Sequence, residues 1–515
     1  MRKIIKSFYW LVDNFLTAAL LKRIKPVDIH NSEYIFIFSH VKSNYSGKLY
    51  TLLLHEFSKQ GVASYFLFKN NLLSSYYPRF DIDGHKISNA FTVEKKKRLI
   101  KSSDGQRLFF EWAVDIENKK IEAKGINFFP IVTNTLRAIQ KRYNVFYNDE
   151  NNKPVYSDLI QSCDLLLKYF LLLKDYANKT NKKIRLVGWE ISYIPNGVFR
   201  MLCDQLTYNR DIEFIELDRG NIGYFGQYHF RESYISTVNH TRTKSSFGWA
   251  VSKEELAEVD DKEIELDELL KPVSKALEKD IYDKIPDNQK TVMKTLEEYQ
   301  SKEKKIFVLF AHLFYDTPLD DESAAFNGMC EWIKETIKYF NGKENLLLIK
   351  PHPSELRKDE PKKKPNETLA SFLRDAQLSD NIIILEPRVF TVKDLSPFMS
   401  CGLIWRSSVA MELTFLGIPC IIAGNPYYSV LDLNIVKDRE QYFDMIKRSH
   451  EINVPEKLKV DIAKYLYLLE KKHAYVDCIS YDVKRRKIHW NRKALKSYLK
   501  SGNQTVNSIV DNMLE

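Results

Sequence analysis

Two stretches decide the fold: LLLIKPHPSE at residues 346–355 and WRSSVAME at residues 405–412. Each contains or directly follows an apolar run that stops abruptly at hydrogen-bonding residues. Both lie where strand-like apolar runs alternate with helical patterns, which is typical of a parallel sheet. Because open α/β folds bind ligands at the carboxyl ends of their strands, the polar residues after the two runs predict a shared ligand site at that edge.

The alternation extends outward in both directions. In the second half, strands are predicted at residues 305–310, 346–350, 382–385, 402–405 and 419–423, and helices near 326–340, 367–376 and 409–416. In the first half, strands are predicted at 34–38, 64–68, 184–189 and 213–217, and helices near 47–60, 158–176 and 197–206. The pattern predicts an α/β protein with two doubly wound, Rossmann-like domains that face a cleft. Periplasmic binding proteins and some kinases share this outline.

A chain of 515 residues is too long for one ordinary core, since cores stop growing at roughly 250 residues. We expect an N-terminal α/β domain at 26–250 and a C-terminal α/β domain at 305–480. The acidic, lysine-rich stretch 251–304 is predicted to be a helical connection. An amphipathic N-terminal segment, 1–25, and a basic C-terminal helical tail, 481–515, complete the division.

Composition narrows the class. With 44% hydrophobic and 28% charged residues, the chain is typical of a soluble globular protein. Six cysteines without a CxxC pair predict buried, reduced thiols and a cytoplasmic location. The net charge of +10 is spread along the chain, with its densest cluster at 484–496, where a solvated helix face or contact with lipid or anionic glycan both fit. Neither zinc-finger spacing nor an RNP-type motif is present, so no nucleic-acid partner is expected.

The N-terminal segment 1–25 is rich in aromatic and basic residues. It could lie in the headgroup plane of an anionic membrane, which predicts peripheral contact with the inner face of the cell membrane. A helix docked on its own domain fits the same pattern. No run approaches the ~20 apolar residues of a membrane span.

The two deciding stretches carry residues suited to a nucleotide. His352, held between two prolines at a strand end, can donate a hydrogen bond to a departing phosphate. Ser407 and Ser408 can cap the following helix while its amides face an anion, and Glu412 can accept hydrogen bonds from ribose hydroxyls. An ordinary turn, simple capping and a surface glutamate are the respective alternatives.

A third candidate follows the first strand at residues 43–47. Here Asn44 and Gly47 begin a predicted helix whose N-terminus is suited to an acceptor or a phosphate group, and an ordinary capped turn fits the same residues. The spacing GxxxxGK[ST] is absent, which argues against an NTPase. No DxD-type cluster stands at a strand end, so neither a metal nor another cofactor is expected.

The order of motifs in the second half resembles that of bacterial capsule polysaccharide biosynthesis proteins, in the stretches 310–316, 332–337, 350–355, 406–419 and 424–428. That family includes transferases of CMP-activated Kdo, and bacterial sialyltransferases share its HP pair, here His352 and Pro353, and its SS pair. The resemblance implies a GT-B glycosyltransferase of capsule or surface polysaccharide assembly, with a nucleotide-sugar donor, a CMP-sugar favoured, and a glycan or glycolipid acceptor. It also implies that 26–250 is the acceptor-side domain and that 305–480 is the nucleotide-sugar-binding domain. A CDP-glycerol glycerophosphotransferase and a non-catalytic glycan-binding capsule assembly protein remain alternatives.

The resemblance also implies a catalytic base for an inverting transfer, placed after a strand of the first domain. Glu216 and Asp218 are the leading candidates, with Glu190 behind them. The sequence departs here from the compact Glu-x-Gly form of the family, and a turn rich in Asp and Gly fits the same residues.

Overall fold

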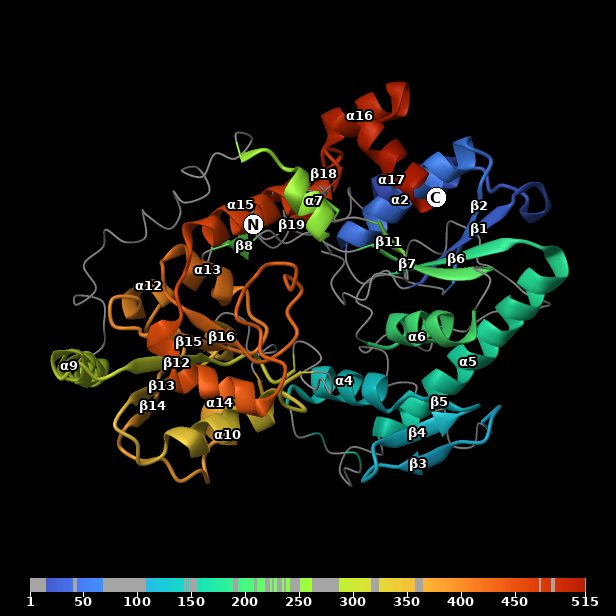
Figure 1. The fold of residues 1–515 in the computed structure, drawn as a ribbon. Helices are drawn as coiled ribbons and strands as arrows, with labels where there is room; N and C mark the ends of the chain where they lie inside the picture. Colours follow the sequence, from blue (N-terminus) through green and yellow to red (C-terminus); the bar gives the residue numbers. More distant parts are fainter. Residues whose placement is uncertain are drawn as a thin grey trace, which may run out of the picture.

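The computed structural model describes residues 15–39, 44–67, 108–142, 145, 147, 155–188, 193–207, 211–217, 223–224, 227–228, 234–235, 238–240, 251–261, 287–315, 324–356, 365–471, 474–482 and 487–514. Two five-stranded sheets organise this part of the chain (Figure 1). Each sheet is covered by helices on both faces, so the α/β prediction is confirmed. The arrangement of two domains that face each other across a cleft stays a prediction.

The second sheet is entirely parallel. Its strands are, in spatial order, β14 (Ile382–Ile384), β13 (Leu346–Lys350), β12 (Ile306–Phe310), β15 (Cys401–Ile404) and β16 (Cys420–Ile422). Each lies within one or two residues of its predicted range. The strands are short, continuous apolar runs because a parallel strand between two helical layers is buried on both faces. When the strands are numbered by their order in the chain, their spatial order is 3-2-1-4-5. This is a doubly wound arrangement with its switch point between β12 and β15.

Helices cover both faces of the second sheet. One face carries α10 (Met329–Phe340), α11 (Leu369–Phe372) and α14 (Arg439–Lys447). The other carries α9 (Asp287–Ser301), α12 (Val392–Leu395), α13 (Val409–Phe415) and α15 (Glu456–Lys471). The predicted helix at 367–376 is shorter than expected, because a capping box between Thr368 and Ser371 starts it and the chain turns after Phe372. The predicted connection 251–304 contains α7 (Lys253–Glu258) and α9, and residues 262–286 lie outside the described part.

The first sheet has four parallel strands and an antiparallel edge. Its spatial order is β11 (Val238–His240), β7 (Ile212–Leu217), β6 (Lys183–Gly188), β1 (Tyr34–Phe38) and β2 (Ala63–Phe66). Helices α4 (Phe129–Gln140), α5 (Val155–Thr180) and α6 (Asn196–Leu206) cover one face. Helices α2 (Asn44–Lys59), α16 (Arg492–Ser501) and α17 (Gln504–Leu514) cover the other. The switch point of this sheet lies between β1 and β6.

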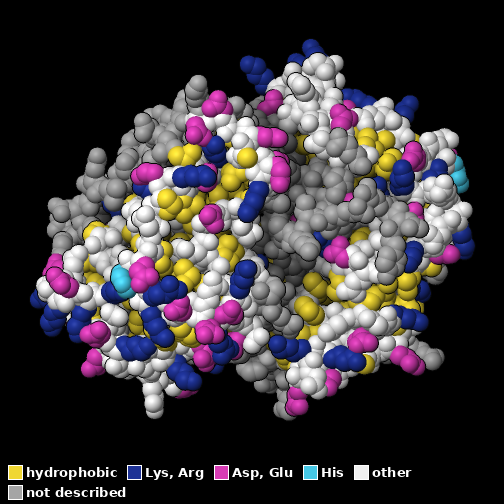
Figure 2. Space-filling model, viewed as in Figure 1, with side chains coloured by type: hydrophobic (Ala, Val, Ile, Leu, Met, Phe, Trp, Pro, Cys, Tyr) yellow, Lys and Arg dark blue, Asp and Glu magenta, His cyan; other side chains and the backbone are white. Residues whose placement is uncertain are grey.

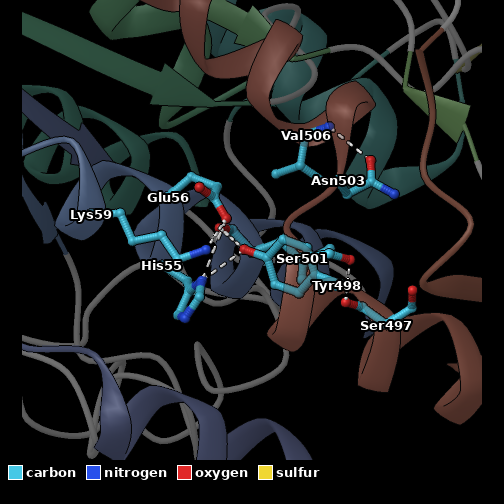
Figure 3. Close-up of polar contacts among 9 residues, drawn as sticks. His55, Glu56, Lys59, Ser497, Tyr498, Ser501, Asn503 and Val506 are labelled. Carbon is cyan, nitrogen blue, oxygen red and sulfur yellow. Dashed lines mark hydrogen bonds and ion pairs between the residues drawn. The ribbon is translucent and has the colours of Figure 1, made fainter.

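The C-terminal segment returns to the first sheet, so that α16 and α17 lie beside α2 (Figure 1). Figure 3 shows Tyr498 of α16 pointing into α2, where its hydroxyl lies 2.8 Å from Nδ1 of His55. Burial opposes ionisation of the neighbouring Glu56, but hydrogen bonds from Tyr498 and Lys59 outweigh it and lower the pKa of this carboxyl. The range 481–515, predicted as a basic tail, therefore contributes side chains to the core of the first sheet. The domain limits themselves stay predictions.

The chain is also helical at residues 15–23. Leu20, Leu21 and Ile24 are buried in the same core as α16 and α17, and Thr17 accepts a hydrogen bond of 2.9 Å from the indole of Trp490. The docked-helix interpretation of the N-terminal segment thus holds for this part, while residues 1–14 lie outside the described residues.

Smaller elements complete the fold. An antiparallel sheet of β3 (Ala113–Asp115), β4 (Lys120–Ala123) and β5 (Ile126–Asn127) packs beside α4 and α5. Three short antiparallel pairs join β8 (Gly223–Tyr224) to β9 (Gln227–Tyr228), β10 (Tyr234–Ile235) to β17 (Ala474–Tyr475), and β18 (Ile479–Asp482) to β19 (Lys487–Trp490). Short 3₁₀ turns, η1 (Ile29–Asn31), η5 (Pro353–Glu355) and η7 (Ser449–Glu451), lie in the connections.

The two halves are also joined beyond the β10–β17 pair. The left-handed residue Lys141, which ends α4, presents its carbonyl oxygen to the backbone N–H of Asn366, and the Asn366 side chain donates to Gln140 O at 2.7 Å.

All six cysteines are buried thiols, as predicted. In the part of the chain that the structure describes, no helix combines the length and the apolar character needed to cross a bilayer. Figure 2 shows Lys and Arg side chains mixed with Asp and Glu over the face in view, in keeping with a charge that is spread along the chain.

Candidate functional site

The polar residues of the two deciding stretches meet at the carboxyl edge of the second sheet. The segment after β12 carries His312, the one after β13 carries His352, and the one after β15 carries Arg406 and Ser407. Because β12 and β15 flank the switch point, this edge is where a doubly wound sheet opens a crevice for a ligand. All four side chains are partly exposed, so they are accessible from solvent.

The backbone fixes the orientation of the His352 ring. His352 is the N-cap of η5, and its Nδ1 accepts the N–H of Ser354 at 3.1 Å. A neutral imidazole that accepts at Nδ1 carries its proton on Nε2. Pro353 follows at the first position of the turn, where its missing N–H costs nothing, and its carbonyl accepts from Arg388 at 2.7 Å. The turn therefore presents Nε2–H of His352 as a donor.

A second imidazole stands beside it. The rings of His312 and His352 lie 5.4 Å apart, centroid to centroid, with 38° between their planes. His312 was not predicted as a site residue, although its position in the sequence carries the same signal as that of His352: a polar side chain shortly after an apolar strand.

The serine turn differs in part from the prediction. Ser407 Oγ accepts the N–H of Val409 at 3.3 Å, so Ser407 caps the start of α13. Ser408 occupies the N-cap position in a helical conformation without capping, and its side chain hydrogen bonds with Tyr427 instead. Both hydroxyls thus lie at the end of β15, but only one caps the helix.

The loop after β16 contacts the serine turn. Nε of Arg406 donates to the carbonyl of Asn425 at 2.7 Å. A Cβ at Gly424 would stand 2.6 Å from the carbonyl oxygen of Trp405, so this close approach needs glycine. The stretch 424–428 was part of the family resemblance in the sequence, but its contact with the serine turn was not predicted.

Charged residues line the same edge. Glu412 lies in the first turn of α13 and is partly exposed, so its carboxylate remains accessible from solvent. Lys350 ends β13, and burial lowers the pKa of its ammonium group to about 8, while Asp394 and Glu412 act in the opposite direction. Groups with pKa values moved toward neutrality are common at functional sites.

Glu355 lies just beyond the histidine turn and is 4% exposed. Both of its carboxylate oxygens accept the N–H of Leu369 at 3.2 Å, which ties η5 to the start of α11. Burial raises the pKa of this carboxyl to about 7, against the effect of that hydrogen bond. Neither Lys350 nor Glu355 was selected from the sequence, since a strand-end lysine and a turn glutamate give no local sign of burial.

On the first sheet, α2 begins at Asn44 and follows β1, beside the switch point. Gly47 is buried in the first turn of this helix, and its carbonyl accepts from Thr51 at 2.8 Å. Across the switch point, Ser39 Oγ donates to the side chain of Asn196 at 2.5 Å, over Gly188, where a Cβ would not fit.

The candidate bases differ in their surroundings. Glu216 lies inside β7, opposite Gly188 on one side and Asn239 on the other, and is 3% exposed. Asp218 directly follows the last residue of β7, and Glu190 follows β6. Both lie outside the described residues.

Comparison with known proteins adds little to this geometry. No protein-family model matches the chain, and neither does any curated protein. Among solved structures, two KpsC proteins of Thermosulfurimonas dismutans are similar, a beta Kdo 2,7 transferase at 15% identity (TM-score 0.28, 67% of this chain and 95% of that one) and a beta Kdo 2,4 transferase at 11% identity (TM-score 0.28, 64% and 87%). UDP-GlcNAc 2-epimerase from Neisseria meningitidis, bound to UDP-GlcNAc, follows at 10% identity (TM-score 0.22, 85% and 98%). Likenesses with TM-scores this low support neither a fold nor an activity.

Proposed function

We propose that the chain is a glycosyltransferase of bacterial capsule or surface polysaccharide biosynthesis that transfers a sugar, with inversion, from a nucleotide donor, a CMP-sugar being favoured. One observation carries the proposal. The donor Nε2–H of His352 and the turn of Ser407 and Ser408 occupy the same carboxyl edge, on strands that flank or adjoin the switch point. The motif order in the sequence supports the same conclusion.

On the donor side, each group has a distinct task. Nε2–H of His352 donates to the phosphate oxygen that leaves with the nucleotide, which stabilises the charge that develops there. The hydroxyls and amides of the serine turn bind the other phosphate oxygens, and the carboxylate of Glu412 accepts from the ribose hydroxyls. Pro353 shapes the turn that presents the imidazole.

On the acceptor side, the start of α2 at Asn44 and Gly47 binds the glycan or glycolipid acceptor. Asp218 is the preferred base, because Glu216 is held between two strands and is almost fully buried. The base removes the proton of an acceptor hydroxyl while that oxygen bonds to the anomeric carbon. The bond from this carbon to the phosphate oxygen breaks, and the nucleotide leaves with both electrons.

Calorimetry of the full chain with CMP, CDP, UDP and GDP tests this proposal. We expect CMP to bind most tightly, and the double variant Ser407→Ala Ser408→Ala to lose most of that affinity. A preference for CDP, with turnover of CDP-glycerol, would indicate a glycerophosphotransferase. Binding of none of the four nucleotides would contradict an enzyme of this class and favour a glycan-binding role.

We further propose a cytoplasmic location with peripheral contact to an anionic membrane. Phe15, the first described residue of the docked N-terminal helix, is 69% exposed. In α16, the exposed residues include four basic side chains and Leu499 but no acidic one, and Figure 2 shows Lys and Arg at the upper edge, where Figure 1 places this helix. Exposed apolar and basic groups together suit a surface of anionic headgroups.

A further inference from the structure

Lys350 closes β13 two residues before His352, and its side chain is 7% exposed. Side chains alternate along a strand, so Lys350 shares its face with Leu346 and Leu348. Those leucines pack against the layer that contains α12 and α13. The stem of Lys350 is thus buried under these two helices, and its ammonium group reaches the carboxyl edge.

The ammonium group of Lys350 makes no hydrogen bond or ion pair with any residue that the structure describes. Asp394 on α12 and Glu412 on α13 act on it from beyond ion-pair distance, and these carboxylates do not offset the cost of burial. The other charged or titratable groups placed at this edge are His312, His352 and Arg406. A buried cation that lacks a close counter-charge destabilises the fold, and such groups concentrate at functional sites.

We propose that Lys350 binds the phosphate group of the nucleotide, an assignment that rests on the proposed function of this edge. The ammonium group offers three donors and a compact positive charge, which suits a phosphate oxygen. A bound phosphate supplies the close counter-charge that the protein does not. Lys350 then holds the phosphate from the sheet side while His352 contacts the leaving oxygen.

Binding of CMP and of cytidine to the full chain separates the phosphate from the nucleoside. In Lys350→Met, affinity for CMP should fall at least tenfold, while affinity for cytidine should stay unchanged. Lys305→Met, which removes a lysine at the opposite edge of the same sheet, should leave both affinities unchanged. Equal loss of both affinities would overturn the assignment and point to an effect on Glu412. Unchanged affinity for CMP would also overturn the assignment. Failure of the wild-type protein to bind any nucleotide would instead overturn the proposed function itself.

A second measurement needs no variant. At pH 8 about half of the Lys350 side chains are neutral, since burial lowers the pKa to about 8, and a phosphate beside the group raises that pKa again. CMP binding at pH 8 should therefore take up a fraction of a proton, measured by calorimetry in buffers of different ionisation enthalpy. Lys350→Met should show no uptake and a higher midpoint of thermal unfolding. Absence of proton uptake by the wild-type protein would overturn the assignment.

Discussion

The phenol hydroxyl of Tyr428 donates a hydrogen bond of 2.5 Å to the carbonyl oxygen of Ser407. A buried side chain from the loop after β16 thereby holds the turn that ends β15. The adjacent Tyr427 packs edge-on against Tyr428, with ring centroids 5.0 Å apart, and hydrogen bonds with Ser408. The two tyrosines therefore hold the backbone of Ser407 and the hydroxyl of Ser408 at the proposed phosphate site.

Tyr428→Phe removes the phenol hydroxyl that holds the serine turn. This change should lower the free energy of unfolding by about 1 kcal/mol and weaken CMP binding severalfold. Tyr442→Phe is a matched control. Tyr442 is equally buried and hydrogen bonds with Trp332 and Thr336, away from the edge. Denaturant unfolding should show similar losses in both variants, and calorimetry a loss of affinity only for Tyr428→Phe. Equal affinities would contradict a supporting role.

Two substitutions at His352 separate its role in the turn from its role in catalysis. His352→Ala removes both the acceptor for Ser354 N–H and the Nε2 donor. His352→Asn restores an acceptor at the N-cap, but its amide is too short to place a donor at the position of Nε2–H. We expect both variants to lose about 100-fold in kcat, while only the alanine variant loses about 1 kcal/mol of stability. Near-normal turnover of the asparagine variant would remove the histidine from the mechanism.

Glu355 predicts a pH dependence of stability. Burial raises the pKa of its carboxyl from the ordinary value of 4.5 to about 7. The folded protein therefore holds a proton that the unfolded chain has released, so wild-type stability falls, relative to Glu355→Gln, as pH rises from about 4.5 to about 7. The total difference should be about 3 kcal/mol. Denaturant unfolding at several pH values from 4.5 to 8 measures it, and parallel curves would show that the carboxyl is not perturbed.

The base is tested by amide substitutions. Asp218→Asn should keep CMP affinity but lose at least about two orders of magnitude in turnover, because the amide cannot accept the acceptor proton. Glu216→Gln is expected to retain turnover, since that side chain lies between paired strands. Steady-state kinetics with a soluble acceptor compares the two. If both variants stay near normal, Glu190 is the next candidate.

Membrane contact is tested best by a small change. Deletion of residues 1–25 would remove the buried Leu20, Leu21 and Ile24, each of which stabilises the core of the first sheet by about 1.5–3 kcal/mol. The protein should then lose its fold along with any binding to the membrane. Deletion of residues 1–14 combined with Phe15→Ser spares these side chains. This variant should sediment less with anionic vesicles and keep its unfolding midpoint. Undiminished sedimentation would argue against the segment as a membrane contact.

Local pattern predicted the parallel strands well. All five strands of the second sheet are short, mainly apolar runs, and burial on both faces leaves that mark in the sequence. The edge strand β11 was missed because three residues, Val238–His240, show no periodicity. The return of residues 476–513 to the first sheet was missed because it depends on contacts between distant parts of the chain.

The same distinction applies to the site. His352 and Ser407 were found because polar residues follow apolar strands, which is visible in one dimension. The burial of Lys350 depends on α12 and α13, and the role of Tyr428 depends on a bond to another loop. Neither relation leaves a local mark.

Thr17 and Trp490 are 473 positions apart in the chain, yet they share a hydrogen bond in one core. During synthesis, strand β1 leaves the ribosome long before α16 and α17 exist to cover it. The second sheet, whose strands and covering helices all lie between residues 287 and 471, can complete its core first. The half of the protein that is translated first is thus the half that finishes folding last. A premature stop codon that removes α16 and α17 would therefore unfold the N-terminal half of the protein.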